Sequence, residues 1–416
     1  MSKIIFHVDV NSAYLSWEAV YRLQHGDTLD LRTIPSAVGG DPIKRHGIIL
    51  AKSHAAKPYK IQTGESLMAA YQKCPHLVVV PPRYDLYLRS SNAMTELLSE
   101  YVAQIQRYSI DECFMDFTDS KKLFGDPVEV AHVIRERIKK ELGFTVSIGI
   151  SSNKLLAKIG SDLKKPDAVT TLFPEEMPSK MWPLPVEELF SVGRATAPKL
   201  RFLGIETIGD LARYDPETLK DTLKSYGTLI WNYANGRESS QVKKNNRLII
   251  KSIGNSSTIP FDIDNREEAY LMLLSLSEMV GVRLRESGYL ARLVAVTFKN
   301  SDFVSKGHQR KFQMATDHTM EIYHYAKVLF DELWDGTDIR HLGVRVSELC
   351  EKDYLQLHIF DAYAIQKNKR LDHAIDALRS RFSPQVISRG CFINSGIKPL
   401  TGGVNEDDFP MMSSLL

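Results

Sequence analysis

Ten residues in the first third of the chain combine a buried-strand pattern with three acids, and this combination restricts the possible folds. Residues 108–117 read YSIDECFMDF, and their aromatic and branched side chains are typical of a buried strand. Carboxylates such as Asp111, Glu112 and Asp116 are rarely buried unless they are paired or hold a metal ion. Since adjacent strand residues point to opposite faces, Asp111 and Glu112 can share a ligand only at a turn or a strand edge. The structural alternative is a hairpin turn at Asp111 and Glu112, with Asp116 ending the strand.

The N-terminal segment favours the metal-binding alternative because it supplies a second acid-bearing strand. Residues 3–11 (KIIFHVDVN) form a nearly continuous apolar run around Asp9, as expected for a strand covered on both faces. Three carboxylates that converge from two strands suit hard divalent cations such as Mg²⁺, which also accept substrate phosphates. Two such ions about 4 Å apart can stabilise the attacking and the leaving oxygen of a phosphoryl transfer. These segments alone do not establish that Asp9 and Asp111 meet in space.

Three motifs, in order, resemble the palm motifs of the Y-family translesion DNA polymerases, the UmuC/DinB group. They are VDVNSAY at residues 8–14, SIDE at 109–112, and SIGISSNKLLAK at 147–158, which is followed by KKP at 164–166. The similarity runs from residue 1 to about residue 351, and a distinct tail follows. A tail of this length favours the UmuC-like branch over the DinB-like branch.

The resemblance implies an α+β, multidomain fold with a ferredoxin-like palm, small fingers, a helical helix-hairpin-helix thumb and a separate α/β little finger. The length of 416 residues is also too great for one typical core. We expect the palm at 1–12 and 77–166, fingers at 13–76, thumb at 167–236, a linker at 237–250, the little finger at 251–352, and a clamp-binding peptide with a C-terminal tail at 353–416.

Hydrophobic periodicity and capping residues predict the elements of these domains. Within the palm, helices are expected over 84–105 and 127–142, and a further helix over 153–163 capped by Ser151 or Ser152. The little finger is expected to follow a βαββαβ order. Residues 390–416, rich in Gly, Ser, Asp and Pro, are expected to be poorly ordered.

The resemblance also implies the catalytic residues. Asp111 and Glu112 would be the catalytic carboxylates, and Asp9, Asp111, Glu112 and the Val10 carbonyl would hold two Mg²⁺ ions. Tyr14 would stack under the sugar and exclude a 2′-hydroxyl group, and its structural alternative is a core tyrosine of the first helix.

A basic run at residues 52–60 (KSHAAKPYK) is expected to contact the triphosphate of the nucleotide. By alignment, His54 and Lys57 occupy positions where many relatives carry Tyr and Arg. Lysine binds phosphate as a point charge, whereas the arginine guanidinium donates two parallel hydrogen bonds. Lys165 is expected to face the same phosphates, together with a helix N-terminus. The alternative for all three is an ordinary solvent-exposed charge.

Several segments beyond the palm are expected to bind the DNA backbone or a sliding clamp. The DNA-binding candidates are Lys243, Lys244 and Arg247 in the linker, and Arg292 and Arg310, with Lys299 and Lys311, on or beside little-finger strands. Residues 189–194 and 203–211 resemble helix-hairpin-helix elements that contact phosphates without reading sequence. The peptide at 356–360 (QLHIF) resembles clamp-binding peptides, with Gln356, Leu357, Ile359 and Phe360 as the contacting residues.

Composition is compatible with this interpretation but does not establish it. The net charge of +2 neither supports nor excludes DNA binding. The four cysteines form no CxxC pair, which argues against a zinc site and suits a reducing compartment. No secretory leader or membrane-length apolar run is found, so a cytoplasmic protein is expected. The resemblance implies a monomeric enzyme acting on primer-template DNA and dNTP.

Two other classes of protein remain open. A nucleotidyl cyclase on the same palm would not need the helix-hairpin-helix segment or a second DNA-facing domain. A catalytically inactive DNA-binding accessory protein would be expected to lack one of the three acids, yet all three are present.

Overall fold

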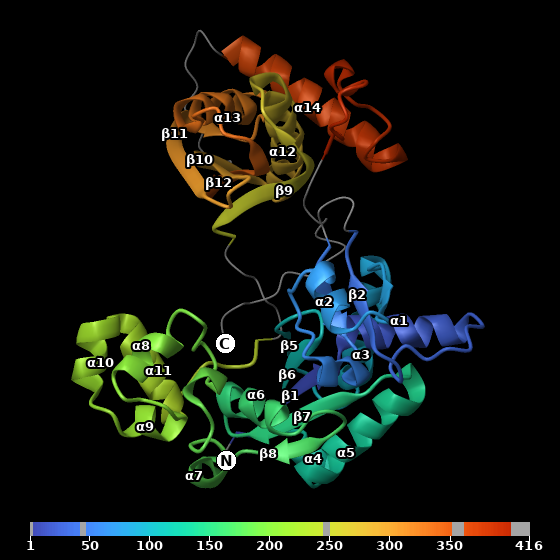
Figure 1. Cartoon of the computed structure of the whole chain (residues 1–416), viewed down its shortest axis with the longest axis vertical. Coiled ribbons are helices and arrows are strands. Elements are labelled where there is room, and N and C mark those ends of the chain that lie inside the picture. The colour runs from blue at the N-terminus through green and yellow to red at the C-terminus, as the bar shows by residue number, and fades with distance from the viewer. Residues whose placement is uncertain (1–2, 42–46, 244–249, 352–361, 401–416) are drawn as a thin grey trace. The chain divides into compact units, whose positions relative to one another are not determined.

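The computed structural model describes residues 3–41, 47–243, 250–351 and 362–400, without the side chains of 362–366, and divides into two compact units (Figure 1). Of the described residues, unit 1 comprises 3–40 and 48–243, and unit 2 comprises Asp41, Gly47 and the residues from 250 onward. Each unit is described by itself. No described helix combines the length and the apolar character needed to cross a membrane.

The centre of unit 1 is a five-stranded sheet in the order β5-β6-β1-β7-β8. Its strands are β1 (Ile5–Val10), β5 (Ile105–Arg107), β6 (Glu112–Asp116), β7 (Val146–Ser151) and β8 (Val169–Thr171). β1 pairs antiparallel with β6 and β7, and every residue of β1 is buried, as the apolar run predicted. β8 pairs parallel with β7, so the sheet continues beyond the proposed palm boundary at residue 166.

Helices cover both faces of this sheet. They are α1 (Ala13–Gln24), α3 (Tyr84–Ser99), α4 (Lys121–Phe124), α5 (Pro127–Arg137) with a π-helical turn (Ile138–Leu142), and α6 (Lys154–Leu163). Phe6 and Val8 of β1 belong to the core shared with α1, α3 and α5, whereas Ile5 packs toward Ala157 of α6. A Cβ on Gly149 would lie 1.9 Å from the Ala157 carbonyl oxygen, so only glycine allows α6 to approach β7 this closely.

Two local predictions in this region are wrong. The helix expected over 84–105 ends at Ser99, because Ile105 begins β5, which pairs with β6. The N-cap of α6 is Asn153, whose side chain accepts a hydrogen bond from the Leu156 N–H; neither Ser151 nor Ser152 caps the helix.

Two smaller parts complete unit 1. A three-stranded sheet in the order β3-β2-β4 contains β2 (Ser36–Gly39), β3 (Ile49–Lys52) and β4 (Val78–Val80), with a 3₁₀ helix (His54–Tyr59) and α2 (Leu67–Lys73). The helical part contains 3₁₀ turns (Pro174–Glu176 and Val186–Glu188) and α7 (Met177–Lys180), α8 (Ala197–Phe202), α9 (Ile208–Arg213), α10 (Pro216–Leu223) and α11 (Ser225–Ala234). Between α8 and α9, Gly204 adopts a positive φ of 77°, which suits a tight hairpin.

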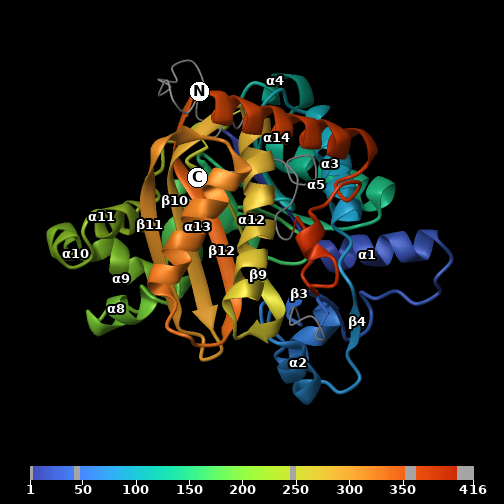
Figure 2. The ribbon, with the colours of Figure 1, turned by 90° about the horizontal axis from the view of Figure 1, so that it is seen from above.

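Unit 2 has the predicted βαββαβ order. Its elements are β9 (Ser252–Ile263), α12 (Arg266–Glu286), β10 (Tyr289–Asn300), β11 (Ser305–Thr316), α13 (Thr319–Leu333) and β12 (Ile339–Glu351). The strands form an antiparallel sheet in the order β11-β10-β12-β9, and α12 and α13 lie side by side across one face (Figure 2). Val294, Val296 and Phe298 of β10 pack against these helices in the core of unit 2.

The residues that follow the sheet of unit 2 dock onto its helices. α14 (Ala362–Phe382) is held by ion pairs from Asp372 and Asp376 to Arg285 of α12. Beyond α14, a 3₁₀ turn (Gly390–Phe392) brings Phe392 into the core, and Ile397 is also buried there. The prediction that the tail is poorly ordered from residue 390 is therefore wrong for 390–400, and residues 401–416 lie outside the described residues.

Candidate active site

Three of the four acids that the sequence singled out, Asp9, Asp111 and Glu112, lie at one edge of two neighbouring strands, whereas Asp116 ends β6 opposite Ile5. Asp9 of β1 lies directly opposite Glu112, the first residue of β6. Asp111 lies in the turn just before β6, and its carbonyl oxygen accepts a hydrogen bond of 3.0 Å from the Val10 N–H. The turn suggested by the structural alternative does exist, and it is what allows three carboxylates from two strands to gather at one edge.

Two lysines partly neutralise this edge. Lys165 Nζ lies 3.0 Å from Asp9 Oδ1 and 2.8 Å from Asp162 Oδ1. Lys158 Nζ lies 2.8 Å from both carboxylate oxygens of Glu112. The site is therefore a compact, mostly buried array of negative and positive groups.

Burial and the nearby Glu112 raise the pKa of both Asp9 and Asp111. Burial raises the pKa of Asp9 to about 8, Lys165 opposes this shift, and the nearby Glu112 adds to it. Burial also raises the pKa of Asp111, while a hydrogen bond from the Ser109 hydroxyl group lowers it. A divalent cation at this edge would replace the proton as the compensating positive charge.

The chemistry of these side chains fits a hard divalent cation. Three carboxylates and the neighbouring main chain supply oxygen ligands only, which is the set that Mg²⁺ prefers. As the described side chains lie, no three His, Cys, Asp or Glu residues among them form a group that could hold a metal ion. Each acid instead has a partner within the protein: Asp9 faces Lys165, Glu112 faces Lys158, and the Asp111 carboxylate accepts a hydrogen bond from the Ser109 hydroxyl group.

Tyr14 lies in the first turn of α1, between the acids and α3. Its ring stacks on Tyr87 with centroids 4.4 Å apart and an angle of 11°, and it meets Tyr84 edge-on at 6.2 Å. Burial, followed by the charge of Asp111, raises the pKa of the Tyr14 phenol to about 12. Tyr14 is thus only half-buried and lies near a catalytic candidate, unlike a simple core tyrosine.

A pocket of about 210 Å³ adjoins Asp9 and is lined by the three residues predicted to bind the triphosphate. His54 and Lys57 enter it from the 3₁₀ helix, and Lys165 enters it from the segment after α6. Arg32 also lines this pocket, although the sequence analysis did not select it. Its guanidinium is bound by Asp30 and by the Gly143 carbonyl, and no motif in the sequence marks such long-range contacts.

His7 is a second residue that the sequence analysis missed. It is fully buried on β1, its Nδ1 lies 2.8 Å from Ser161 Oγ, and its Nε2 lies 3.9 Å from Glu112 Oε2. Burial, with Lys158 and Lys165, lowers the pKa of His7 well below its usual value, so the imidazole is neutral. Its signal in the sequence was a single polar residue inside an otherwise apolar strand.

The predicted DNA-binding residues lie in different environments. Lys243 is exposed at the end of the described part of unit 1. Arg292 is exposed beside an irregularity of β10. Arg310, however, lies opposite Val294 on the helix-covered side of the sheet, and its Nη2 is 2.6 Å from Glu332 of α13. Lys244 and Arg247 lie outside the described residues, as do the clamp-binding candidates Gln356, Leu357, Ile359 and Phe360.

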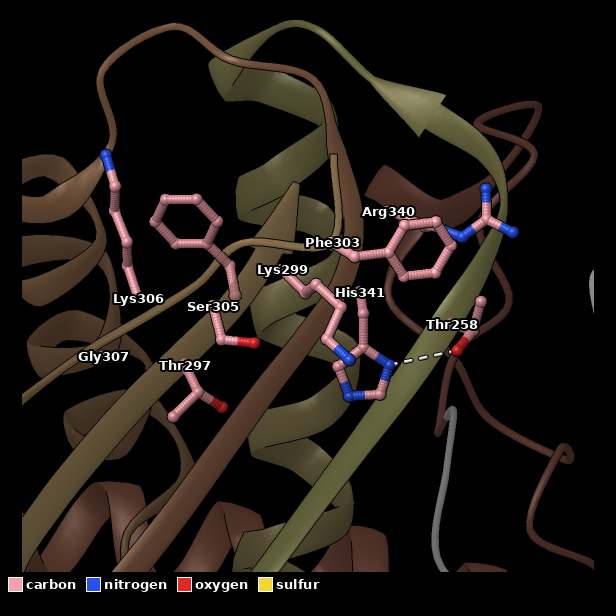
Figure 3. Close-up of a pocket in the computed structure, with 10 residues that line it drawn as sticks. Thr258, Thr297, Lys299, Phe303, Ser305, Lys306, Gly307, Arg340 and His341 are labelled. Carbon is pink, nitrogen blue, oxygen red and sulfur yellow. Dashed lines mark hydrogen bonds between the residues drawn. The ribbon is translucent and has the colours of Figure 1, made fainter. Parts of the chain in front are cut away.

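The other side of the same sheet carries basic side chains that the helices do not cover. We call it the open face, and it includes Lys299 of β10, Lys311 of β11 and Arg345 of β12. At one end, Figure 3 shows Lys299 and His341 beside a pocket of about 580 Å³. His341 accepts or donates a hydrogen bond of 3.1 Å with Thr258, and burial and Lys299 lower its pKa. The open face is therefore polar and basic.

Comparison with known proteins gives consistent results across most of the chain. The model of the impB/mucB/samB family matches residues 8–162, and the model of the C-terminal domain of the same family matches residues 250–359. The chain is 46% identical to the DNA polymerase IV of Clostridium acetobutylicum over 94% of this chain and 99% of that protein. It is 37% identical to DNA polymerase IV 2 of Bacillus subtilis over 94% of this chain and 95% of that protein.

Solved structures share the fold. A chimeric Y-family DNA polymerase (Dbh-Dpo4-Dbh) matches with a TM-score of 0.70 at 22% identity, covering 84% of this chain and all of that chain. A Dbh ternary complex matches with a TM-score of 0.56 at 22% identity, covering 84% of this chain and 99% of that chain. The UmuC-like branch predicted from the tail is not confirmed, because alignments to proteins named DNA polymerase IV cover 94% of this chain.

Proposed function

Because this chain belongs to the impB/mucB/samB family of Y-family DNA polymerases, we propose that it is a template-directed translesion DNA polymerase. The single observation that carries the proposal is the edge of the five-stranded sheet. There, Asp9 and Glu112 lie opposite each other, Asp111 directly precedes Glu112, and a pocket lined by His54, Lys57 and other basic residues adjoins Asp9. Anion-binding side chains next to metal-binding carboxylates are what transfer of a nucleoside triphosphate requires.

The reaction joins the primer 3′-oxygen to the α-phosphorus of an incoming dNTP. The bond from the α-phosphorus to the bridging oxygen breaks, pyrophosphate leaves, and the hydroxyl proton passes to solvent or a nearby base. Asp9, Asp111, Glu112 and the Val10 carbonyl would hold the divalent cations, two Mg²⁺ ions, which supply charge neutralisation at the transferred phosphate. Lys165, Lys57 and His54 would bind the triphosphate, and Arg32 joins them in the proposal because it lines the same pocket.

Tyr14 would select the sugar. A ring that projects from α1 near Asp111 and is backed by Tyr87 can occupy the space of a 2′-hydroxyl group. A ribonucleotide would then have to displace the ring or bind out of line, whereas a deoxyribonucleotide fits.

The DNA duplex would contact basic residues in both units. Lys243, Lys244, Arg247 and Arg292 remain candidates, and Lys299, Lys311 and Arg345 of the open face replace Arg310. The replacement is supported by the ion pair between Arg310 and Glu332, which already compensates that charge. Contacts of this kind bind phosphate without reading sequence.

A sliding clamp would hold the enzyme on DNA through Gln356, Leu357, Ile359 and Phe360. Tethering raises the local concentration of the enzyme at the primer end without changing its active site. Stimulation by a clamp should disappear in the Leu357→Ala/Phe360→Ala variant, while single-nucleotide incorporation on a short primer stays unchanged. Full stimulation of this variant would remove the peptide from the proposal.

We further propose a cytoplasmic monomer with the domain order expected from sequence, in which β8 extends the palm sheet past residue 166 and residues 390–400 join the core of the little finger.

Primer extension by the purified full chain is the decisive test. The templates would be undamaged or would carry one abasic site, and the matched control would be Asp111→Asn, which keeps the size of the side chain and removes its charge. Extension by the wild type and none by the control supports the proposal. A wild type that binds primer-template DNA but never extends it would instead indicate an accessory DNA-binding protein.

A further inference from the structure

The helix that carries Tyr14 also carries a fully buried acid. Glu18 lies four residues after Tyr14, so both side chains project from the same face of α1. Its relative exposure is 0%, and a buried carboxylate is retained only where strong partners compensate the lost hydration.

The partners of Glu18 are two arginines with different positions. Arg22 Nε lies 2.8 Å from Glu18 Oε1, but Arg22 belongs to α1 itself. Arg83 binds both oxygens, with Nη2 2.7 Å from Oε1 and Nε 3.0 Å from Oε2, and it lies 65 residues away. The Arg83 guanidinium also covers the ring of Tyr21, 3.9 Å from its centroid. Two parallel hydrogen bonds from one guanidinium fix both the orientation and the distance of Arg83 relative to Glu18, which a single hydrogen bond from a lysine does not.

Arg83 is the residue immediately before α3, the helix that supports the Tyr14 ring. The next residue, Tyr84, meets Tyr14 edge-on, and Tyr87, one turn later, stacks on it. The ion pair therefore connects α1 to the start of α3. It lies one helical turn along α1 from Tyr14, whose ring contacts Tyr84 and Tyr87. A shift of α3 relative to α1 would move the surface on which the Tyr14 ring lies.

We propose that the Glu18–Arg83 ion pair is a positioning device for Tyr14 and thereby sets how strongly the enzyme discriminates between deoxyribonucleotides and ribonucleotides. This inference rests on the proposed function and on Tyr14 as the residue that excludes the 2′-hydroxyl group. Neither Glu18 nor Arg83 touches the substrate. Their effect is to keep the ring from yielding when a ribose enters.

The test compares kcat/KM for a dNTP with kcat/KM for the matching rNTP in single-nucleotide incorporation by the full chain. The main variants are Glu18→Gln, which keeps the size of the side chain, and Arg83→Lys, which keeps the charge and removes the two parallel hydrogen bonds. Discrimination is expected to fall several-fold in each, chiefly because kcat/KM for the rNTP rises. In a Tyr14→Ala background, Glu18→Gln should cause no further loss, because residues that act as one unit are not additive.

Two control variants separate positioning from general destabilisation. Arg22→Ala removes the other arginine bound to Glu18 but leaves the link to α3 in place, so discrimination should not change. Glu278→Gln in unit 2 changes a carboxylate that is also buried and also bound by two arginines, Arg379 and Arg389, and it should not alter discrimination either.

The outcomes are distinguishable from failure of the proposed function. A wild type without primer extension overturns the function, and an unchanged ratio in Tyr14→Ala overturns the role of Tyr14 and this inference with it. If Tyr14→Ala relaxes the ratio but folded Glu18→Gln or Arg83→Lys protein keeps the wild-type value, only this inference is overturned. If Glu18→Gln does not fold, Arg83→Lys alone decides.

Discussion

The two main sheets of this protein contain similar elements but are buried to very different extents. In unit 1, helices cover both faces, every residue of β1 is buried, and the candidate catalytic acids lie at the sheet edge. In unit 2, helices cover one face, and the open face presents cations such as Lys311 and Arg345 to solvent. The comparison shows that two sheets with similar strands and helices can differ in function because of burial. A buried sheet edge suits chemistry, whereas an exposed sheet face suits binding.

Electrostatics explain why the distinction matters. At the buried edge, removal from water raises the pKa of Asp9 to about 8, so the site has a strong requirement for positive charge. On the open face, water and salt screen each cation, and Lys311 forms only a loose pair with Glu348, 3.3 Å away. Single residues should therefore dominate the first region, whereas the second should act through the sum of its charges.

The largest expected effect tests the buried edge directly. Asp111→Ala should lower the rate of nucleotide incorporation by roughly 10³-fold or more, since the missing charge neutralisation at the transferred phosphate is worth several kcal/mol. Affinity for primer-template DNA should stay nearly the same. The measurement is single-turnover incorporation, with Lys311→Ala at saturating DNA as the control. Near-normal turnover of Asp111→Ala would contradict the metal-ligand assignment.

A smaller effect is expected at the side of the same site. Tyr14→Ala should reduce discrimination against ribonucleotides by roughly tenfold to a hundredfold, because a cavity replaces the ring that the 2′-hydroxyl group would strike. The ratio of dNTP to rNTP incorporation measures this change. Incorporation of the correct dNTP should continue, which separates this variant from Asp111→Ala. An unaltered ratio of dNTP to rNTP incorporation would mean that Tyr14 only packs in the core and does not exclude the 2′-hydroxyl group.

The pH dependence of metal binding should reveal the buried environment of Asp9. Because the raised pKa keeps Asp9 mostly protonated at pH 7, a cation must displace this proton. Apparent Mg²⁺ affinity should therefore rise as pH rises, by up to about tenfold per unit below pH 8, and level off above it. Calorimetry in two buffers of different ionisation enthalpy should detect proton release at pH 7. Affinity that is flat from pH 6.5 to 8.5 would show that Asp9 is already ionised.

The smallest effect per residue is expected on the open face. Replacing Lys299, Lys311 and Arg345 together by Ala should reduce the salt dependence of DNA binding by about 0.9 in logarithmic slope for each phosphate that the variant no longer neutralises. Arg310→Ala is the matched control, since it lies on the neighbouring position of β11 but faces α13, and its slope should equal that of the wild type. An equal decrease in the control and the triple variant would mean that the two sides of the sheet do not differ in function.

Much of this architecture was accessible from local patterns. The apolar run around Asp9 predicted a strand buried on both faces, because a strand covered by helices needs apolar residues at every position. The alternation of elements in unit 2 was also predicted correctly, from strand and helix patterns together with the resemblance to a little finger domain. The acids of the first two motifs were also selected as candidates, since carboxylates inside apolar strands are costly without a partner. These features depend on neighbours in the chain, which a sequence displays directly.

Other features depended on contacts between distant residues. Arg310 and Lys311 are adjacent in the sequence, yet strand alternation and pairing with β10 place them on opposite sides of the sheet. The docking of residues 390–400 required the buried partners Phe392 and Ile397 to reach a core built by α12 and α13. Composition predicted disorder for residues 390–400 because it gives the average polarity of a segment, but not which of its apolar side chains pack into a core. The amino-acid sequence thus determined the strands, the helices and the acids, whereas tertiary packing decided which charges are paired, which are buried and which face solvent.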